Sequence, residues 1–103
     1  MLQLHPENEV IKKQRERRDF FTMMAVSNSG FRSYHELFDL AYSENPGGVS
    51  SSLILSVYIK KTLIPEIASM MGVSNRVAIS VIGTGIRRKR DMYKKRKEKE
   101  LIK

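Results

Sequence analysis

The chain of 103 residues carries 19 lysines and arginines against 11 aspartates and glutamates, a formal net charge of +8, and it has no cysteine. Its length suits one small domain, and the lack of cysteine excludes a disulfide framework or a thiolate metal site. No apolar run approaches the roughly 18 to 20 residues of a membrane span, so we expect a cytoplasmic protein with no membrane partner.

The net positive charge comes entirely from the second part of the chain. Residues 1–60 hold seven basic and seven acidic side chains, whereas residues 61–103 hold twelve basic and four acidic ones, a net charge of +8. Such a polarity is typical of a surface that binds a polyanion. A polyanion is therefore the expected partner, and with the motif at residues 64–83 described below it becomes double-stranded DNA in the nucleoid.

Residues 7–24 combine many charges with spaced apolar residues, which predicts a helix. Its expected apolar contacts are Val10, Ile11, Phe20, Phe21, Met23 and Met24. The last four of these could form the contact of a homodimer, or they could simply belong to the core. Ser27 to Gly30 interrupt the pattern.

A second helix is predicted to begin near Ser33, with Glu36 as its capping-box partner. Its apolar face comprises Tyr34, Leu37, Phe38 and Ala41. Residues 43–48, with the sequence SENPGG, predict a loop. A third helix is predicted from a cap at residues 50–52 to about Lys61. Its mostly buried apolar residues would be Leu53, Leu55, Val57, Tyr58 and Ile59.

Residues 64–83 fit a helix-turn-helix template. Thr62 can cap the first motif helix, and Pro65 falls in its first turn, where a missing amide is tolerated. Ala68 is small where the second helix must approach. Gly72 stands at the turn, where a left-handed backbone is accessible without a side chain.

The second motif helix is predicted to begin after Ser74, whose hydroxyl would act as the N-cap. Val73 precedes it as the apolar residue of the turn. Val77, Ala78 and Val81 recur at helical spacing and are expected to face the first motif helix. This motif usually places its second helix in the major groove of DNA.

Five residues of the second motif helix and its cap are candidates for base contacts: Ser74, Asn75, Arg76, Ile79 and Ser80. The guanidinium of Arg76 can bind guanine O6 and N7 together, although a phosphate contact or a solvated position stays open for it. Asn75 suits adenine or a phosphate. Ile79 suits a thymine methyl group, a dimer contact or core packing.

Gly83 and Gly85 are expected to weaken the end of this helix, since each costs about 1 kcal/mol relative to alanine. Beyond them the chain could be helix or coil. Eight basic residues there are candidates for phosphate contacts: Arg87, Arg88, Lys89, Arg90, Lys94, Lys95, Arg96 and Lys97. Such contacts depend steeply on salt and carry little sequence information. An RNA-binding arm or a nuclear-import signal would look the same. Tyr93 is expected to pack on the fold rather than to stack on a base.

The sequence shows no recognisable pattern of catalytic residues. His5 and His35 are remote in sequence and have no cysteine to complete a metal site, residues 50–52 offer serines without a base partner, and no phosphate-binding loop occurs. We therefore expect no enzyme, no cofactor and no metal.

The segment from Tyr58 to Arg87 resembles the DNA-binding effector domain of the master sporulation response regulator of Gram-positive spore formers. The matching residues are Leu63, Pro65, Glu66, Ile67 and Ala68 in the first motif helix, followed by Arg76 and Val77 in the second. Residues 30–43 match the preceding helix of that family more loosely. The resemblance implies an all-helical DNA-binding domain in which Arg76 contacts bases.

Together these patterns predict an all-α domain of about five helices over residues 1–86, with the helix-turn-helix at 62–83 and a basic extension at 87–103. The expected function is sequence-specific binding of double-stranded DNA by a homodimeric transcriptional regulator. One alternative is a DNA-binding accessory factor in plasmid or phage maintenance, recombination or packaging. Another is a module that docks on RNA polymerase or another regulator.

Overall fold

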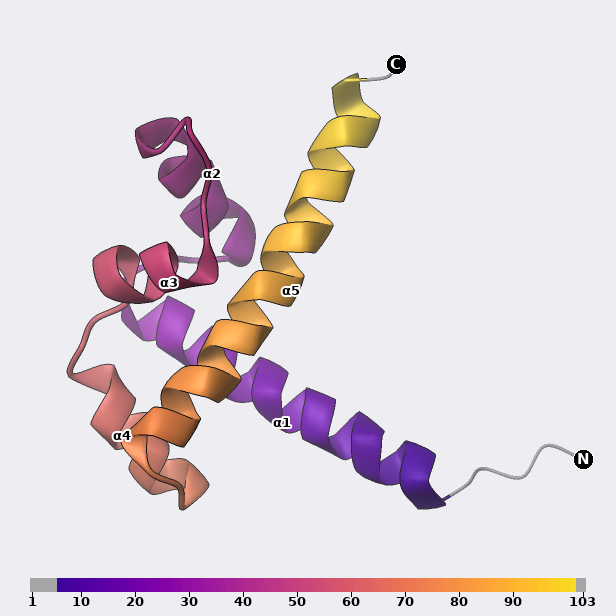
Figure 1. The fold of residues 1–103 in the computed structure, drawn as a ribbon, viewed down its shortest axis with the longest axis vertical. Coiled ribbons are helices and arrows are strands. Elements are labelled where there is room, and N and C mark those ends of the chain that lie inside the picture. Colours follow the sequence, from indigo (N-terminus) through magenta and orange to yellow (C-terminus); the bar gives the residue numbers. More distant parts are fainter. Residues whose placement is uncertain (1–5, 102–103) are drawn as a thin grey trace, which may run out of the picture.

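Five α-helices and one π-helical turn build the domain, and no strand occurs in residues 6–101, the part that this computed structural model describes. The elements are α1 (Pro6–Asn28), α2 (Tyr34–Glu44), α3 (Ser51–Leu53), the π turn η1 (Ile54–Tyr58), α4 (Leu63–Met71) and α5 (Asn75–Leu101). The long helices α1 and α5 cross, and α2, α3 and α4 follow one another along one side of the crossing (Figure 1). The predicted all-α fold is confirmed.

The core lies where the C-terminal half of α1, α2 and the middle of α5 meet. Its buried side chains are Phe21, Ala25, Val26, Leu37, Phe38, Ala41, Val49, Ile54, Ile59, Leu63, Ile67, Ile82 and Ile86. Among residues 6–101, no single helix is long and apolar enough to span a membrane; only α4 and α5 together pass that test, and they are bent by 98°.

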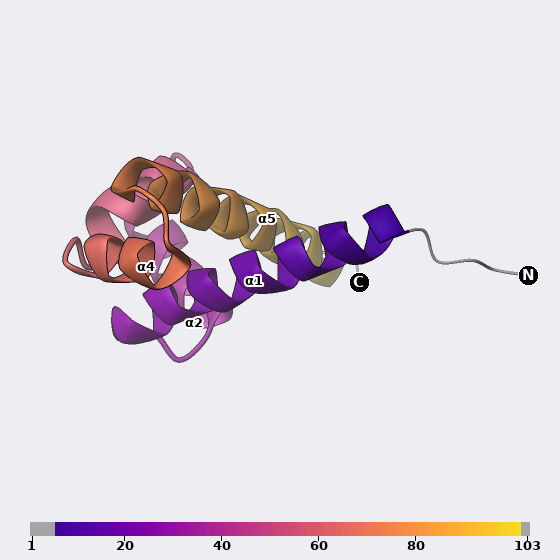
Figure 2. The ribbon, with the colours of Figure 1, turned by 90° about the horizontal axis from the view of Figure 1, so that it is seen from below.

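Helix α1 is longer than predicted, but its buried residues, among those whose side chains are described, lie only between Phe21 and Val26. It continues to Asn28, and the amide of Ser29 still bonds the carbonyl oxygen of Ala25. The expected contacts from Val10, Ile11 and Phe20 are wrong: these side chains are exposed, Phe20 by 60%. Val10 and Ile11 lie near the N-terminal end of α1, which extends beyond the other helices in Figure 2. Phe20 is exposed because it points about 160° around the helix from the buried Thr22.

Helix α2 follows its local signals closely. The hydroxyl of Ser33 accepts a hydrogen bond from the amide of Glu36, as the capping box predicts. The carboxylate of Glu36 in turn accepts from the amide of Arg32, one residue before the expected partner. Leu37, Phe38 and Ala41 are buried and Tyr34 is half-buried, so the predicted apolar face is confirmed.

The third predicted helix is shorter and partly of another type. Ser50 caps it through a hydrogen bond from the amide of Leu53, but the α-helical turn becomes the π turn η1 and ends at Tyr58 rather than Lys61. The amide of Lys60 donates to the hydroxyl of Ser29 instead, which ties this segment to the end of α1. Val57 is exposed, contrary to prediction, because i to i+5 bonding shifts side chains off the α-helical spacing.

Helix α5 runs without interruption from Asn75 to Leu101, across both glycines and across the boundary suggested at residues 86 and 87. Of the two open possibilities, helix and coil, the structure shows the helix. Gly85 serves close packing. A Cβ atom built there would overlap the side chain of Thr22 on α1. The hydroxyl of Thr22 donates to the carbonyl oxygen of Arg18, which lies on the same helix. The missing side chain therefore lets α1 and α5 cross at close range.

Candidate nucleic-acid interface

A short turn at residues 72–74 joins α4 to α5. Gly72 is left-handed, with φ 70° and ψ 35°, and its amide bonds the carbonyl oxygens of Ala68 and Ser69. The hydroxyl of Ser74 accepts from the amide of Val77, which confirms the predicted N-cap of α5. The helices on either side of the turn are bent by 98° relative to each other, close to the range typical of a helix-turn-helix motif.

Two details of the motif differ from the prediction. Thr62 makes no side-chain capping bond, because the carbonyl oxygens of Lys60 and Lys61 already accept from the first two amides of α4. Val77 is 44% exposed rather than packed on α4. Ala78, which was also expected to face α4, is fully buried, and adjacent residues point about 100° apart around a helix.

The candidate base-contacting residues divide into two neighbouring stripes of α5. Arg76 and Ser80 are exposed and recur with Gly83 and Arg87 at spacings of four, three and four, which places them along one side of the helix. We call these four residues the reading stripe. It faces away from the core, because the buried residues Ala78, Ile82 and Ile86 lie on other sides of α5.

Asn75 and Ile79 form the second stripe, beside the first. They line a groove with Leu55 of η1 and with Ile64 and Pro65 of α4. Ile79 is 45% exposed, so it is neither a core residue nor fully solvated. The hydroxyl of Ser74, the fifth candidate, is engaged as the helix cap.

The eight basic candidates beyond residue 86 are not equivalent. Arg87, Arg88, Lys94, Lys95 and Arg96 are exposed. The guanidinium of Arg90 donates to the carbonyl oxygen of Val49 at 3.0 Å and to the carboxylate of Asp91. The bond to Val49 holds α5 against the loop that precedes α3.

Lys89 and Lys97 are also engaged within the fold. The Lys89 ammonium lies 5.4 Å from the ring centroid of Tyr34. That of Lys97 lies 3.6 Å from a carboxylate oxygen of Glu100 and 5.6 Å from the ring centroid of Tyr93. The five exposed side chains are therefore the ones best placed for phosphates.

Tyr93 packs on the fold, as predicted. Its ring stacks on Tyr42 and lies against Phe38, and its hydroxyl donates to the carboxylate of Asp39. Burial and this hydrogen bond raise the pKa of Tyr93 to about 12. The contact anchors the C-terminal part of α5 to α2.

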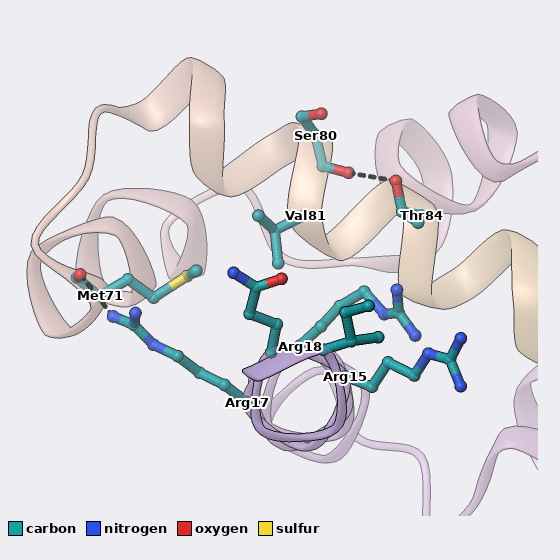
Figure 3. Close-up of a pocket in the computed structure, with 9 residues that line it drawn as sticks. Arg15, Arg17, Arg18, Met71, Ser80, Val81 and Thr84 are labelled. Atoms are coloured by element: carbon teal, nitrogen blue, oxygen red, sulfur yellow. Dashed lines mark hydrogen bonds between the residues drawn. The ribbon is translucent and has the colours of Figure 1, made fainter. Parts of the chain in front are cut away.

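Besides Arg76 and the basic residues beyond residue 86, α1 carries a group of arginines that the sequence analysis did not single out. Arg15, Arg17 and Arg18 of α1 lie in a pocket bounded by Met71 and by Ser80, Val81 and Thr84 of α5 (Figure 3). Residues 1–60 balance in total charge, which concealed this local excess. The spacing of Arg15 and Arg18, three residues apart and therefore on one side of a helix, was the available signal.

Groups suited to other chemistry are sparse in the described residues. His35 pairs with Asp39 at 3.1 Å in the neighbourhood of Tyr93, while His5 lies outside the described part of the chain. Within residues 6–101, no three histidine, aspartate or glutamate side chains are grouped as metal ligands.

No protein-family model matches the chain, and no curated protein or solved structure is detectably similar to it. The resemblance of Tyr58 to Arg87 to the sporulation regulator's effector domain therefore stays a prediction.

Proposed function

We propose that this protein binds double-stranded DNA in a sequence-specific manner and acts as a transcriptional regulator. The observation that supports this function best is the combination of a helix-turn-helix bend with an unobstructed reading stripe on α5. Arg76, Ser80 and Arg87 of that stripe are exposed, and the cap at Ser74 begins α5 directly beside them. An α-helix fits the major groove of B-DNA, which is about 12 Å wide.

The residues of the reading stripe are suited to different contacts with DNA. Arg76, in the first turn of α5, is suited to guanine because its guanidinium can donate to O6 and N7 together. Ser80 can contact several base edges, whereas Gly83 is half-buried and faces Leu55 of η1. Arg87 lies three turns beyond Arg76, where the helix leaves the groove, and is suited to a phosphate.

The second half of α5 supports binding without specifying sequence. Lys94 continues the side of α5 that carries Arg76 and Arg87, because the spacing of seven residues corresponds to about two turns. Arg88, Lys95 and Arg96 are exposed elsewhere around the helix. Their contribution to affinity is expected to fall steeply with added salt.

The test is selection of an operator from random duplexes, followed by fluorescence-anisotropy titration at two salt concentrations. The wild type is compared with Arg76→Ala and with Arg96→Ala, which removes an exposed arginine outside the reading stripe. We expect Arg76→Ala to lose about 1 to 3 kcal/mol of discrimination against the wrong base while residual salt-dependent binding persists. Arg96→Ala should weaken all sequences alike. Binding without an enriched motif, indifferent to Arg76, would refute sequence-specific reading.

A second candidate function, docking on RNA polymerase or another regulator, is favoured by the groove beside the reading stripe. Leu55, Ile64, Pro65 and Ile79 give it an apolar lining, which suits a protein partner better than a phosphate backbone. Binding to purified RNA polymerase without DNA, lost on Ile79→Ser and retained in Arg76→Ala, would support this function. No binding to the polymerase would leave DNA reading as the proposal.

A further inference from the structure

The N-terminal half of α1 presents a basic ridge to α5. Arg15 and Arg18 follow Ile11 and precede Thr22 at spacings of four, three and four, so the four residues lie on one side of the helix. Thr22 is the residue that meets Gly85 at the crossing of α1 and α5. The two arginines must therefore point toward α5 as well.

The space beside these arginines is a pocket of about 430 Å³ between α1 and α5, lined by apolar side chains such as Ile11, Met71 and Val81 as well as by the arginines. Figure 3 shows Arg15 and Arg18 extending to one side of α1, below Thr84, whereas Arg17 extends to the other side, toward Met71. The Arg17 guanidinium donates to the carbonyl oxygen of Met71 at 2.7 Å and so fixes the wall formed by α4. Ser80 belongs to both the pocket and the reading stripe.

The positive charge of the pocket is poorly balanced by the protein. Among the described side chains, those of residues 8–101, Arg15 has no carboxylate partner. The Arg18 side chain is only 17% exposed, and its Nε lies 3.7 Å from the Asp19 carboxylate without a hydrogen-bond partner in the described structure. Glu16 points about 100° around the helix from Arg15. Two arginines thus line one pocket, and an anion bound there would satisfy the unpaired Nε of Arg18.

We propose that this pocket binds a phosphate of the DNA backbone, on the strand that flanks the groove entered by α5. The inference rests on the proposed function and adds a grip on the side of α5 opposite the groove lined by Asn75 and Ile79. Arginine suits the task because its planar fork can donate to two phosphate oxygens at once. The basic residues that hold DNA would then come from α1 as well as from the C-terminal half of α5.

The first test compares Arg15→Gln with Lys13→Gln. Both remove one positive charge from an exposed position of α1, but residue 13 points to nearly the opposite side of the helix from the ridge. On the selected operator, Arg15→Gln should bind about tenfold more weakly, and its slope of log affinity against log salt should be smaller by about 0.9. Lys13→Gln should keep the wild-type slope. Arg15→Lys should restore the slope but only part of the affinity, because the fork is lost.

The second test locates the phosphate by ethylation interference. One ethylated phosphate beside the operator should weaken the wild type and Lys13→Gln but have no effect on Arg15→Gln. If the wild type selects an operator and the two glutamine variants agree in slope and interference pattern, the pocket is refuted while the proposed function stands. If the wild type selects no operator, the proposed function fails, and this inference fails with it.

Discussion

Gly85 shows how one missing side chain determines the crossing of the two long helices. Alanine is the better helix former by about 1 kcal/mol, yet a Cβ atom at position 85 would overlap the Thr22 side chain. Because both residues are buried, neither helix can move aside without disturbing the core. We predict that Gly85→Ala lowers the free energy of unfolding by about 1 to 3 kcal/mol.

The measurement is urea unfolding followed by circular dichroism, with Gly83→Ala as the matched control. A Cβ atom at position 83 would lie 3.3 Å from the Leu55 Cδ1 atom, the end of a side chain that can rotate, so this variant should be neutral or more stable. Adding Thr22→Ala to Gly85→Ala should recover much of the loss, because the overlap is removed. Equal stability of the two single alanine variants would contradict this account.

At the scale of elements, α5 is held to α2 by Tyr93. Its ring contacts Phe38 and Tyr42, and burial and the bond to Asp39 raise the pKa of Tyr93 to about 12. An unfolded tyrosine has a pKa of about 10, so the unfolded chain loses this proton first as the pH rises. The stabilisation is therefore complete below pH 10 and is lost as the pH passes through 12.

This reasoning predicts that the wild type loses stability between pH 10 and 12 more steeply than Tyr93→Phe. Tyr34, whose pKa burial also raises to about 12, is unchanged in the variant, as are the lysines, so the difference between the two curves isolates Tyr93. Urea unfolding at several pH values across this range gives both curves. Parallel curves would show that the Tyr93 hydroxyl is not held in its neutral form by the fold.

Sequence reasoning succeeded where the signals are local. The cap at Ser33, the turn at Gly72 and the cap at Ser74 each depend on residues within four positions of each other, and all were predicted. It failed where distant segments meet, as in the contact of Thr22 with Gly85. Helix propensity alone made that glycine a weak point, because the partner that requires it is 63 positions away in the chain.

In the candidate interface, too, some features depend on local sequence and others on contacts between distant segments. The reading stripe follows from the periodicity of α5 alone, and so it could be assigned in advance. The pocket of Arg15 and Arg18 depends on α1 lying against α5, and the engagement of Arg90 by Val49 spans 41 positions. The sequence shows that Arg90 is one of several basic residues, but it does not show that its guanidinium is already bonded to the carbonyl oxygen of Val49.

At the scale of the whole molecule, the exposed apolar residues of α1 are the best candidate for a dimer contact. Phe20 is 60% exposed and lines a surface pocket with Met23, Met24 and Ser27. This patch and the arginine ridge lie on different sides of α1, because Phe20 points about 160° around the helix from Thr22. Pairing through the patch would therefore leave the proposed phosphate pocket accessible in both subunits.

We predict that Phe20→Ser converts a homodimer to a monomer without loss of folding, since the side chain is exposed in the single subunit. Sedimentation velocity over a range of concentrations measures the assembly state, and Val57→Ser, which removes another exposed apolar side chain, is the control. A two-fold operator should then bind the Phe20→Ser protein as independent half-sites, with each half-site affinity unchanged. A wild type that stays monomeric at all concentrations, and on the operator, would exclude this surface as a dimer contact.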